Sequence, residues 1–522
     1  MKRILYVLMG LMGLMGCSNE TVTDAKQETA LPQLYPDYVG VTIPANIAPL
    51  NFCMADEAAL RIDAVITDSH GHQLHSQGEE SVDIDLDDWH ELLGQNRCDS
   101  LSVSVSAKYD DGWHTYRPFA IYVSADSIDY GICYRLIAPG HEVWSKMGIY
   151  ERDLSTFDER ALIENTQFEG CVNCHSFNRG NPDNMSLHIR GKHGATLLSK
   201  DDGSITAYNT KTDQTLGLCV YPYWHPSGRY IAYSTNVTKQ TFHSAHPNRI
   251  EVFDEASDLQ VYDVEKNELL LTPLLRQDSV YETFPAFAAD GRSLYFCAAR
   301  ALPEGDHQLD SIRYNLCRID FDPTTGTFGN RIDTIVDAAA QKKSISFPRP
   351  SYDGRFLCYT LSDYGQFSIW HHEADLYLLD LGNEELRMKN EEFATAHSAQ
   401  PDSSFFILHS SFKNSPLSEA NSPDTESFHN WSTNSRWLVL SSRRDDGLFT
   451  RPYFCHVDAE GAVTKAFMLP QQNPRRFYRQ RFLSYNVPDF ITGPTRFDSR
   501  QAVRAINAEQ RKDFGVRKAS VK

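Results

Sequence analysis

Alternating apolar and polar positions recur along most of the chain. In Leu60–Ile66 and Leu101–Ser106, apolar side chains stand at nearly every second position, the spacing at which they line one face of a β-strand. One stretch, Asp87–Leu93, has the longer spacing of a short helix. The pattern therefore predicts an all-β fold with little helix.

A turn followed by an apolar strand repeats through the second half of the chain. Three clear copies share a Gly-Arg pair, at Gly228, Gly291 and Gly354, and a degenerate copy lies at 430–440. The glycine supplies the conformation of a tight turn, and the alternating apolar residues after it line the interior of a sheet.

This repeat resembles the blades of TolB-like, WD40-like β-propellers. Some copies lead to a second strand that ends on an acid, as at Leu259–Asp263 and Leu376–Asp380. The three glycines are 63 residues apart, more than the ~40–45 residues of a minimal WD40 blade, so we expect loops inserted in the blades. We predict about six blades, within a range of about five to eight. A sandwich of similar strands would not explain the repeated turn and strand.

The chain of 522 residues is longer than a single core normally supports. Ahead of the repeats, residues 35–145 have alternating stretches but no Gly-Arg turn, which predicts a separate β-rich N-terminal domain. The segment 146–195 follows and contains the cysteine motif described below. The propeller is expected over 196–485, and 486–522 forms a C-terminal tail rich in arginine and lysine.

The N-terminus has the features of an export signal. Basic residues at Lys2 and Arg3 precede the apolar run Ile4–Met15, which is too short to span a membrane comfortably, and small residues lead to Cys17. This end resembles the lipobox of bacterial lipoproteins, so 1–16 is predicted to be a signal peptide and 17–34 a lipidated Cys17 with a flexible tether. We expect a cell-envelope protein held by lipid on the outer membrane, on its periplasmic or its surface side.

Composition narrows the possible partners and the possible cysteine pairs. The formal net charge is −19 at pH 7, which disfavours a nucleic-acid partner. Lipid takes one of the eleven cysteines and the motif described next takes two. Several of the other eight cysteines lie in apolar stretches with the pattern of a strand, where a buried small side chain is expected. We predict no disulfide pairing among these eight.

The sequence Cys171-Val172-Asn173-Cys174-His175 has the spacing of c-type haem attachment. In that chemistry two thiols add to the haem vinyl groups, and the histidine ligates the iron. A redox-active pair of cysteines would be expected in a thioredoxin-like setting and a zinc knuckle would need further ligands, and neither context is evident. We therefore predict one covalent haem c, with a disulfide or a bare dithiol as the alternative.

The sixth iron ligand is expected in the next stretch of chain. His188 is favoured because it lies far enough from His175 for the chain to pass round a haem edge, and Met185 and His193 are the alternatives. Arg190 is then placed to neutralise a haem propionate.

Three stretches together, 35–44, Cys171–Phe177 and His188–Gly191, resemble a Bacteroidetes-type family of TolB-like propeller lipoproteins with an embedded c-type cytochrome motif. Members are often labelled cytochrome c biosynthesis proteins. The resemblance implies an envelope location, a propeller and a haem motif, and it supplies no catalytic residues.

Two classes of function are left open. In the first, the chain is an electron-transfer or haem-dependent docking component that meets a redox or assembly protein of the envelope. In the second, the propeller is an interaction or ligand-binding platform, and the haem is structural or absent. No catalytic residue is predicted, because the Gly-x-Ser-x-Gly elbow of propeller hydrolases does not occur in the sequence.

Overall fold

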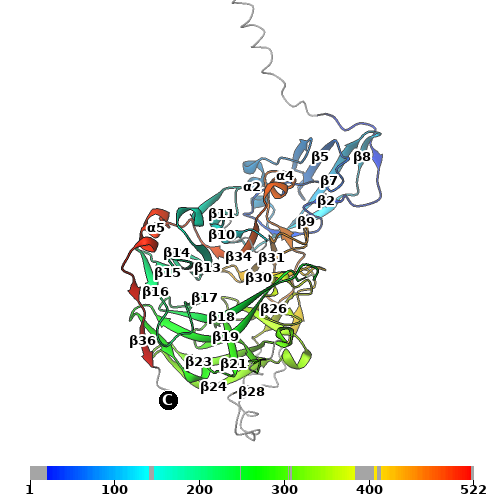
Figure 1. Cartoon of the computed structure of the whole chain (residues 1–522). Helices are drawn as coiled ribbons and strands as arrows, with labels where there is room; N and C mark the ends of the chain where they lie inside the picture. Colours follow the sequence, from blue (N-terminus) through cyan, green and yellow to red (C-terminus); the bar gives the residue numbers. More distant parts are fainter. Residues whose placement is uncertain are drawn as a thin grey trace, which may run out of the picture. The chain divides into compact units, whose positions relative to one another are not determined.

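The computed structural model describes residues 20–139, 146–246, 248–303, 305, 308–382, 405–407 and 413–518 (Figure 1). The signal peptide and Cys17 lie outside the described residues. The chain divides into two compact units, one made of the residues up to Gly40, Pro49–Val123 and Pro470–Tyr478, and a larger one made of the rest. No helix in the described part of the chain is long and apolar enough to cross a membrane.

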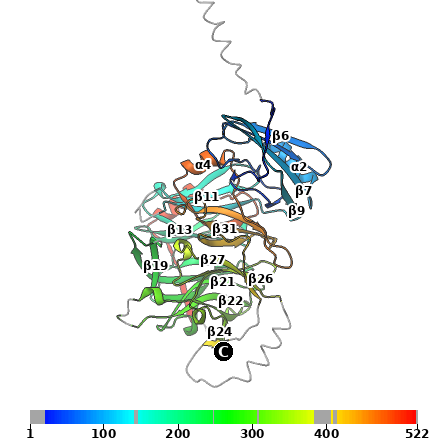
Figure 2. The same cartoon turned by 90° about the vertical axis from the view of Figure 1, so that its right-hand side faces the viewer.

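The smaller unit is built on a mainly antiparallel sheet in the order β1-β8-β7-β5-β6, with β9 also paired to β7. Figure 2 labels β6, β7 and β9 of this sheet. Its alternating stretches became strands because Ile62, Ala64 and Ile66 point into the core from one face. The short helix is present as α2 (Leu86–Gln95), and Asp85 caps its first N–H groups. The strands are β1 (Lys26–Gln27), β2 (Leu34–Tyr35), β4 (Cys53–Met54), β5 (Arg61–Thr67), β6 (Gln73–Gly78), β7 (Ser100–Tyr109), β8 (Gly112–Thr115) and β9 (Phe119–Ser124).

In the larger unit, the described strands form six blades of a β-propeller. The first strands of neighbouring blades contact one another in a closed circle, β34 to β13, β17, β21, β25, β30 and back to β34. Blade 1 is β34 (Ser484–Ile491), β10 (Gly131–Ile137), β11 (Gly148–Asp153) and β12 (Glu159–Glu164); blade 2 is β13 (Cys171–Asn178), β14 (Asn181–Arg190), β15 (Ala195–Ser199) and β16 (Ile205–Asn209); blade 3 is β17 (Val220–Trp224), β18 (Tyr230–Phe242), β19 (Ile250–Asp263) and β20 (Glu268–Leu271).

The three turns with a Gly-Arg pair and the degenerate copy lie in blades 3 to 6. Gly228, Gly291 and Gly354 each have a positive φ in the turn between the first and second strands, and Ser435 takes the same conformation in the degenerate copy. Blade 4 is β21 (Val280–Phe287), β22 (Ser293–Arg300), β23 (Asn315–Asp322) and β24 (Thr327–Val336), with β28 (Phe405–Ile407) on its edge; blade 5 is β25 (Ser344–Pro350), β26 (Phe356–Ser362), β27 (Asp375–Asp380) and β29 (Asn414–Pro416); blade 6 is β30 (Glu426–Trp431), β31 (Trp437–Ser442), β32 (Arg451–His456) and β33 (Phe467–Met468).

The predicted all-β fold with a propeller of about six blades and a β-rich N-terminal region is therefore confirmed. The boundaries of the propeller differ from the expected 196–485. Its blades begin at Gly131, the segment 146–195 supplies β11 to β14, and β34, which reaches into the expected tail, is the first strand of blade 1. Blade 1 joins strands from distant parts of the chain and has no Gly-Arg turn, so no local pattern marks it.

From Ser499 to Lys518 the C-terminal tail lies along the outside of blades 2 and 3, as the red segment of Figure 1 shows. Helix α5 (Ser499–Asn507) contacts β15 and β16 and buries Ala502 and Ile506. Strands β35 (Lys512–Asp513) and β36 (Gly515–Lys518) then pair with β16 and β20. The other described strand and α-helix are β3 (Thr42–Pro44) and α4 (Pro474–Gln480).

Candidate functional site at the centre of the propeller

The motif Cys171–His175 lies on β13, the first strand of blade 2. Its pairing with β14 shifts between Asn173 and Ser176, and Cys174 has a φ of 45°. This is a β-bulge, in which one strand carries an extra residue. The left-handed conformation costs free energy for a residue with a side chain, so a reason for it must lie in the surrounding fold.

This bulge belongs to the propeller fold, because the first strand of every blade has one at the same place. The residues equivalent to Cys174, all with φ between 45° and 52°, are Tyr221, Phe284, Phe347, Phe428 and Val487. We call these six residues the bulge ring. Phe284 lies 4.6 Å from Tyr221 and 4.1 Å from Phe347 between ring centroids, and Phe347 lies 4.8 Å from Phe428. The ring packs apolar side chains at the centre of the propeller, and Cys174 is its member from blade 2.

His175 occupies the position after the bulge, where four of the other blades have proline. It is buried, and its Nε2 lies 3.3 Å from the carbonyl oxygen of Cys133 in blade 1. Burial lowers the pKa of His175 to about 4. The imidazole is therefore neutral at physiological pH and lies between blades 1 and 2.

His188 lies on the other face of the same sheet. Its neighbours Leu187 and Ile189 pack in a cluster with residues of blade 1, so alternation along β14 turns His188 toward blade 3. Ser186, two residues away, bonds Tyr233 of blade 3 at 2.9 Å. Burial lowers the pKa of His188 to about 3.

The other predicted residues also divide between the two faces. Met185 packs in the cluster that faces blade 1. Cys171 pairs with Arg190 across the sheet, so both share the face of His188. Arg190 is exposed, and His193 is half-buried in the turn before β15.

These residues do not fit one haem on the folded blade. Haem c attachment needs two thiols and a ligating imidazole around one group. The Cys171 thiol lies on the same face of the sheet as His188. Burial raises the pKa of Cys174, and Arg190 and the backbone of Tyr221, both on that side, act against this rise. His175 faces blade 1 instead. Both histidines have a buried Nδ1 without a partner, but the sheet separates the two rings.

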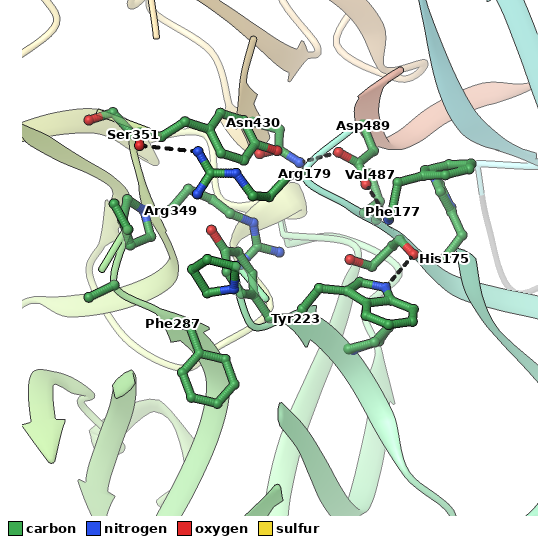
Figure 3. A pocket seen from close by; sticks show the side chains of 18 residues that line it. His175, Phe177, Arg179, Tyr223, Phe287, Arg349, Ser351, Asn430, Val487 and Asp489 are labelled. Atoms are coloured by element: carbon green, nitrogen blue, oxygen red, sulfur yellow. Dashed lines mark hydrogen bonds between the residues drawn. The ribbon is translucent and has the colours of Figure 1, made fainter. Parts of the chain in front are cut away.

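A hollow lies beside the bulge ring, where the first strands run into the turns that follow them (Figure 3). Its volume is about 40 Å³, room for about three water-sized groups, which is far less than a porphyrin needs. All six blades line it. The lining residues used below are Arg179, Tyr223, Arg349, Tyr352, Asn430 and Asp489.

Two guanidinium groups border this hollow. Arg349 on β25 lies over the Tyr223 ring at 5.3 Å, and its Nη1 donates to the Pro348 carbonyl at 3.0 Å. Arg179, exposed in the turn after β13, lies over the Tyr352 ring at 4.9 Å. Among the described residues, neither guanidinium has a carboxylate at ion-pair distance.

Asp489 on β34 supplies an acid at the same hollow. Its oxygens accept the backbone N–H of Phe177 at 2.9 Å and the amide of Asn430 at 2.6 Å, as Figure 3 shows. Burial raises the pKa of Asp489 to about 7, although the backbone N–H of Phe177 and the charge of Arg349 oppose the rise. The carboxyl is thus partly protonated near neutral pH.

Sequence reasoning did not find Arg349, Asn430 or Asp489. A signal existed, because each is a polar or charged residue that stands two residues after the bulge residue of its strand. That position faces the hollow, but its importance depends on knowing where the bulge lies.

Two histidines of the smaller unit are bonded locally. His72 and His75 contact Asp68 and Asp63 at 2.9 and 2.6 Å. In the described part of the chain, no group of three or more His, Cys, Asp or Glu side chains could hold a metal ion. The cysteines there have free thiols.

Fold and hollow together define the class of the protein: a six-bladed β-propeller with a polar hollow at its centre. No protein-family model matches the chain, and no curated protein sequence matches it either. Among solved structures, a DUF4784 family protein from Bacteroides caccae is similar at 8% identity over 69% of this chain and 94% of that chain, with a TM-score of 0.26.

Two peptidase structures have comparable scores. A prolyl endopeptidase matches at 10% identity over 65% of this chain and 42% of its own, with a TM-score of 0.34. Dipeptidyl peptidase 4 of Porphyromonas gingivalis matches at 9% identity over 89% of this chain and 64% of its own, with a TM-score of 0.28. The chain thus spans less than two thirds of these two peptidases, and similarities this low say nothing about what it binds.

Proposed function

We propose that the chain is a binding protein, and that its propeller holds part of a ligand or partner in the central hollow. The observation that carries this proposal is the pair of guanidiniums at the hollow without carboxylate partners. Arg349 is half-buried, so its charge is kept there at a cost in desolvation, which a bound group of opposite charge offsets, while the exposed Arg179 adds charge at the rim.

The scaffold suits a binding site. Arg349, Asn430 and Asp489 each stand on a first strand, and bulges of equal geometry set the direction of these strands. Groups held on strands keep their positions better than groups held on loops. Tyr223 and Tyr352 add aromatic surface at the same place, which is typical of ligand sites.

The N-terminal sequence supports an envelope location for this activity, with the chain anchored through a lipid on Cys17. Mass analysis of the N-terminal peptide tests the anchor. We expect a diacylglyceryl group on the native chain and its loss in Cys17→Ser.

Binding is tested with a chemically mixed set of small fragments, followed by ligand-detected NMR on the full chain. Ala289→Trp places a large side chain at the hollow, and Ala58→Trp on the exposed surface of the smaller unit is the matched control. We expect bound fragments to be lost in Ala289→Trp and kept in Ala58→Trp. If no fragment binds, or if binding is equal in both variants, the proposal is wrong.

A second candidate function, an electron carrier with one haem c that docks on a redox or assembly protein, is supported by the Cys171–His175 motif alone. A pyridine haemochrome spectrum and the intact mass decide it, on protein matured where haem is attached. One haem of added mass, lost in Cys171→Ala/Cys174→Ala, would support this candidate. A colourless chain of unmodified mass would leave binding as the function.

A further inference from the structure

The Arg349 guanidinium lines the hollow and uses little of its hydrogen-bonding capacity within the protein. A guanidinium has five N–H donors, and the structure pairs its Nη1 with Pro348, the preceding residue in the chain. The Tyr223 ring covers one face of the group and leaves its edge for a ligand. A planar donor edge of this kind binds the two oxygens of an oxyanion in parallel.

Other contacts at the hollow limit what can enter it. Asn430 uses an amide N–H on Asp489, and Trp224 uses its indole N–H on the carbonyl of Ser176 at 3.0 Å. Those donors are thus occupied within the protein. With a volume of about 40 Å³, the hollow accepts a group of a few heavy atoms.

Asp489 does not exclude an anion. Both of its oxygens already accept hydrogen bonds from Phe177 and Asn430. Arg349 on β25 and Asp129 are the charged groups that act on it, and the phenol of Tyr223 on β17 lies near it. Because burial raises its pKa to about 7, the carboxyl carries only part of a charge near neutral pH.

From these contacts we infer that the hollow recognises an oxyanion, the carboxylate or phosphate group of a small ligand with an aromatic or apolar body. Arg349 binds its oxygens, Arg179 adds charge at the rim, and the Tyr223 and Tyr352 rings contact the body. The inference rests on the proposed function, since it names the ligand class of the same site.

The test uses the full chain and three probes that share an aromatic body: N-acetylphenylalanine, phenyl phosphate and the neutral N-acetylphenylalaninamide. Binding is measured by NMR for the native chain, Arg349→Met, Arg349→Lys and Arg292→Met. Arg292 is exposed in the turn between β21 and β22 of blade 4 and does not line the hollow, so it is the control for lost charge.

We expect at least about tenfold tighter binding of one anionic probe than of the amide, and a loss of about tenfold or more in Arg349→Met. Arg349→Lys should bind with intermediate affinity and Arg292→Met like the native chain. The probe that binds better identifies carboxylate or phosphate.

Equal binding of the amide, unchanged affinity in Arg349→Met, or no binding of either anion at millimolar concentration would overturn the inference. Neutral fragments that Ala289→Trp displaces would still leave the proposed binding function standing, so the two failures are distinguishable.

Discussion

The imidazole of His175 lies between blades 1 and 2, whereas that of His188 lies on the opposite face of blade 2, toward blade 3. Regular alternation along β13 would put His175 on the face of Asn173, which pairs with His188. The bulge at Cys174 produces the separation, because its extra residue moves His175 to the opposite face. The Cys171–His175 motif has the spacing for haem attachment in an unfolded chain. Folding places the expected iron ligands His175 and His188 in two different spaces between blades.

The two thiols of the motif should differ in reactivity. Cys171 is partly exposed, while Cys174 is buried in the bulge ring and burial raises its pKa, so the thiolate is disfavoured there. We expect maleimide to label Cys171 and Cys98, which is exposed, and to leave Cys174 unlabelled until the chain unfolds. Peptide mass mapping measures the labelled fraction, and equal labelling of Cys171 and Cys174 in the native state would contradict the burial.

The bulge ring should contribute strongly to stability. Phe347 is 4% exposed and contacts Phe284 and Phe428, so Phe347→Ala should lower the free energy of unfolding by about 3–5 kcal/mol. Phe482 is 69% exposed, and Phe482→Ala should change it by less than about 0.5 kcal/mol. Denaturant unfolding compares the two variants, and similar losses would mean that the ring does not pack as described.

Two arginines that stack on tyrosine rings should respond differently to removal. Arg444 lies over Tyr453 at 4.6 Å and pairs with the fully buried Glu426 at 2.8 Å, so Arg444→Met leaves a buried charge and should cost about 3 kcal/mol. Arg349 has no such partner, so Arg349→Met should cost less than about 1 kcal/mol or stabilise the chain.

Urea unfolding of both variants at one pH provides the comparison. A loss in Arg349→Met as large as that in Arg444→Met would indicate that Arg349 serves the fold rather than a ligand.

Asp489 should make the stability depend on pH. Its pKa is about 7 in the folded chain against an ordinary value of 3.8, so the folded state binds the proton more tightly. The resulting stabilisation is fully present below about pH 4 and is lost as the pH rises to about 7. Asp489→Asn should therefore gain stability relative to the native chain across that interval, by up to about 4 kcal/mol.

Unfolding at several pH values measures this difference. Asp353→Asn, at an exposed acid in the turn after β25, serves as the control for the loss of a carboxyl group. A difference for Asp489→Asn that does not change with pH would mean that its pKa is not raised.

The sequence by itself determined the repeating unit of this protein. The turn at Gly228, Gly291 and Gly354 and the apolar strand after each are local features, set by backbone freedom at glycine and by alternation. Blades 3 to 5 could therefore be predicted from sequence stretches of about a dozen residues. The same holds for the strands of the smaller unit and for α2, whose cap and apolar face lie within one short segment.

Only the tertiary structure decided how the ring closes and what lies at its centre. β34 pairs with β10 although most of the chain separates them, and Arg349, Asn430 and Asp489 meet because three blades bring them to one axis. The faces of His175 and His188 likewise depend on a bulge that recurs in all six first strands. Pairing over such distances depends on the packing of whole blades, which no local pattern of side chains specifies.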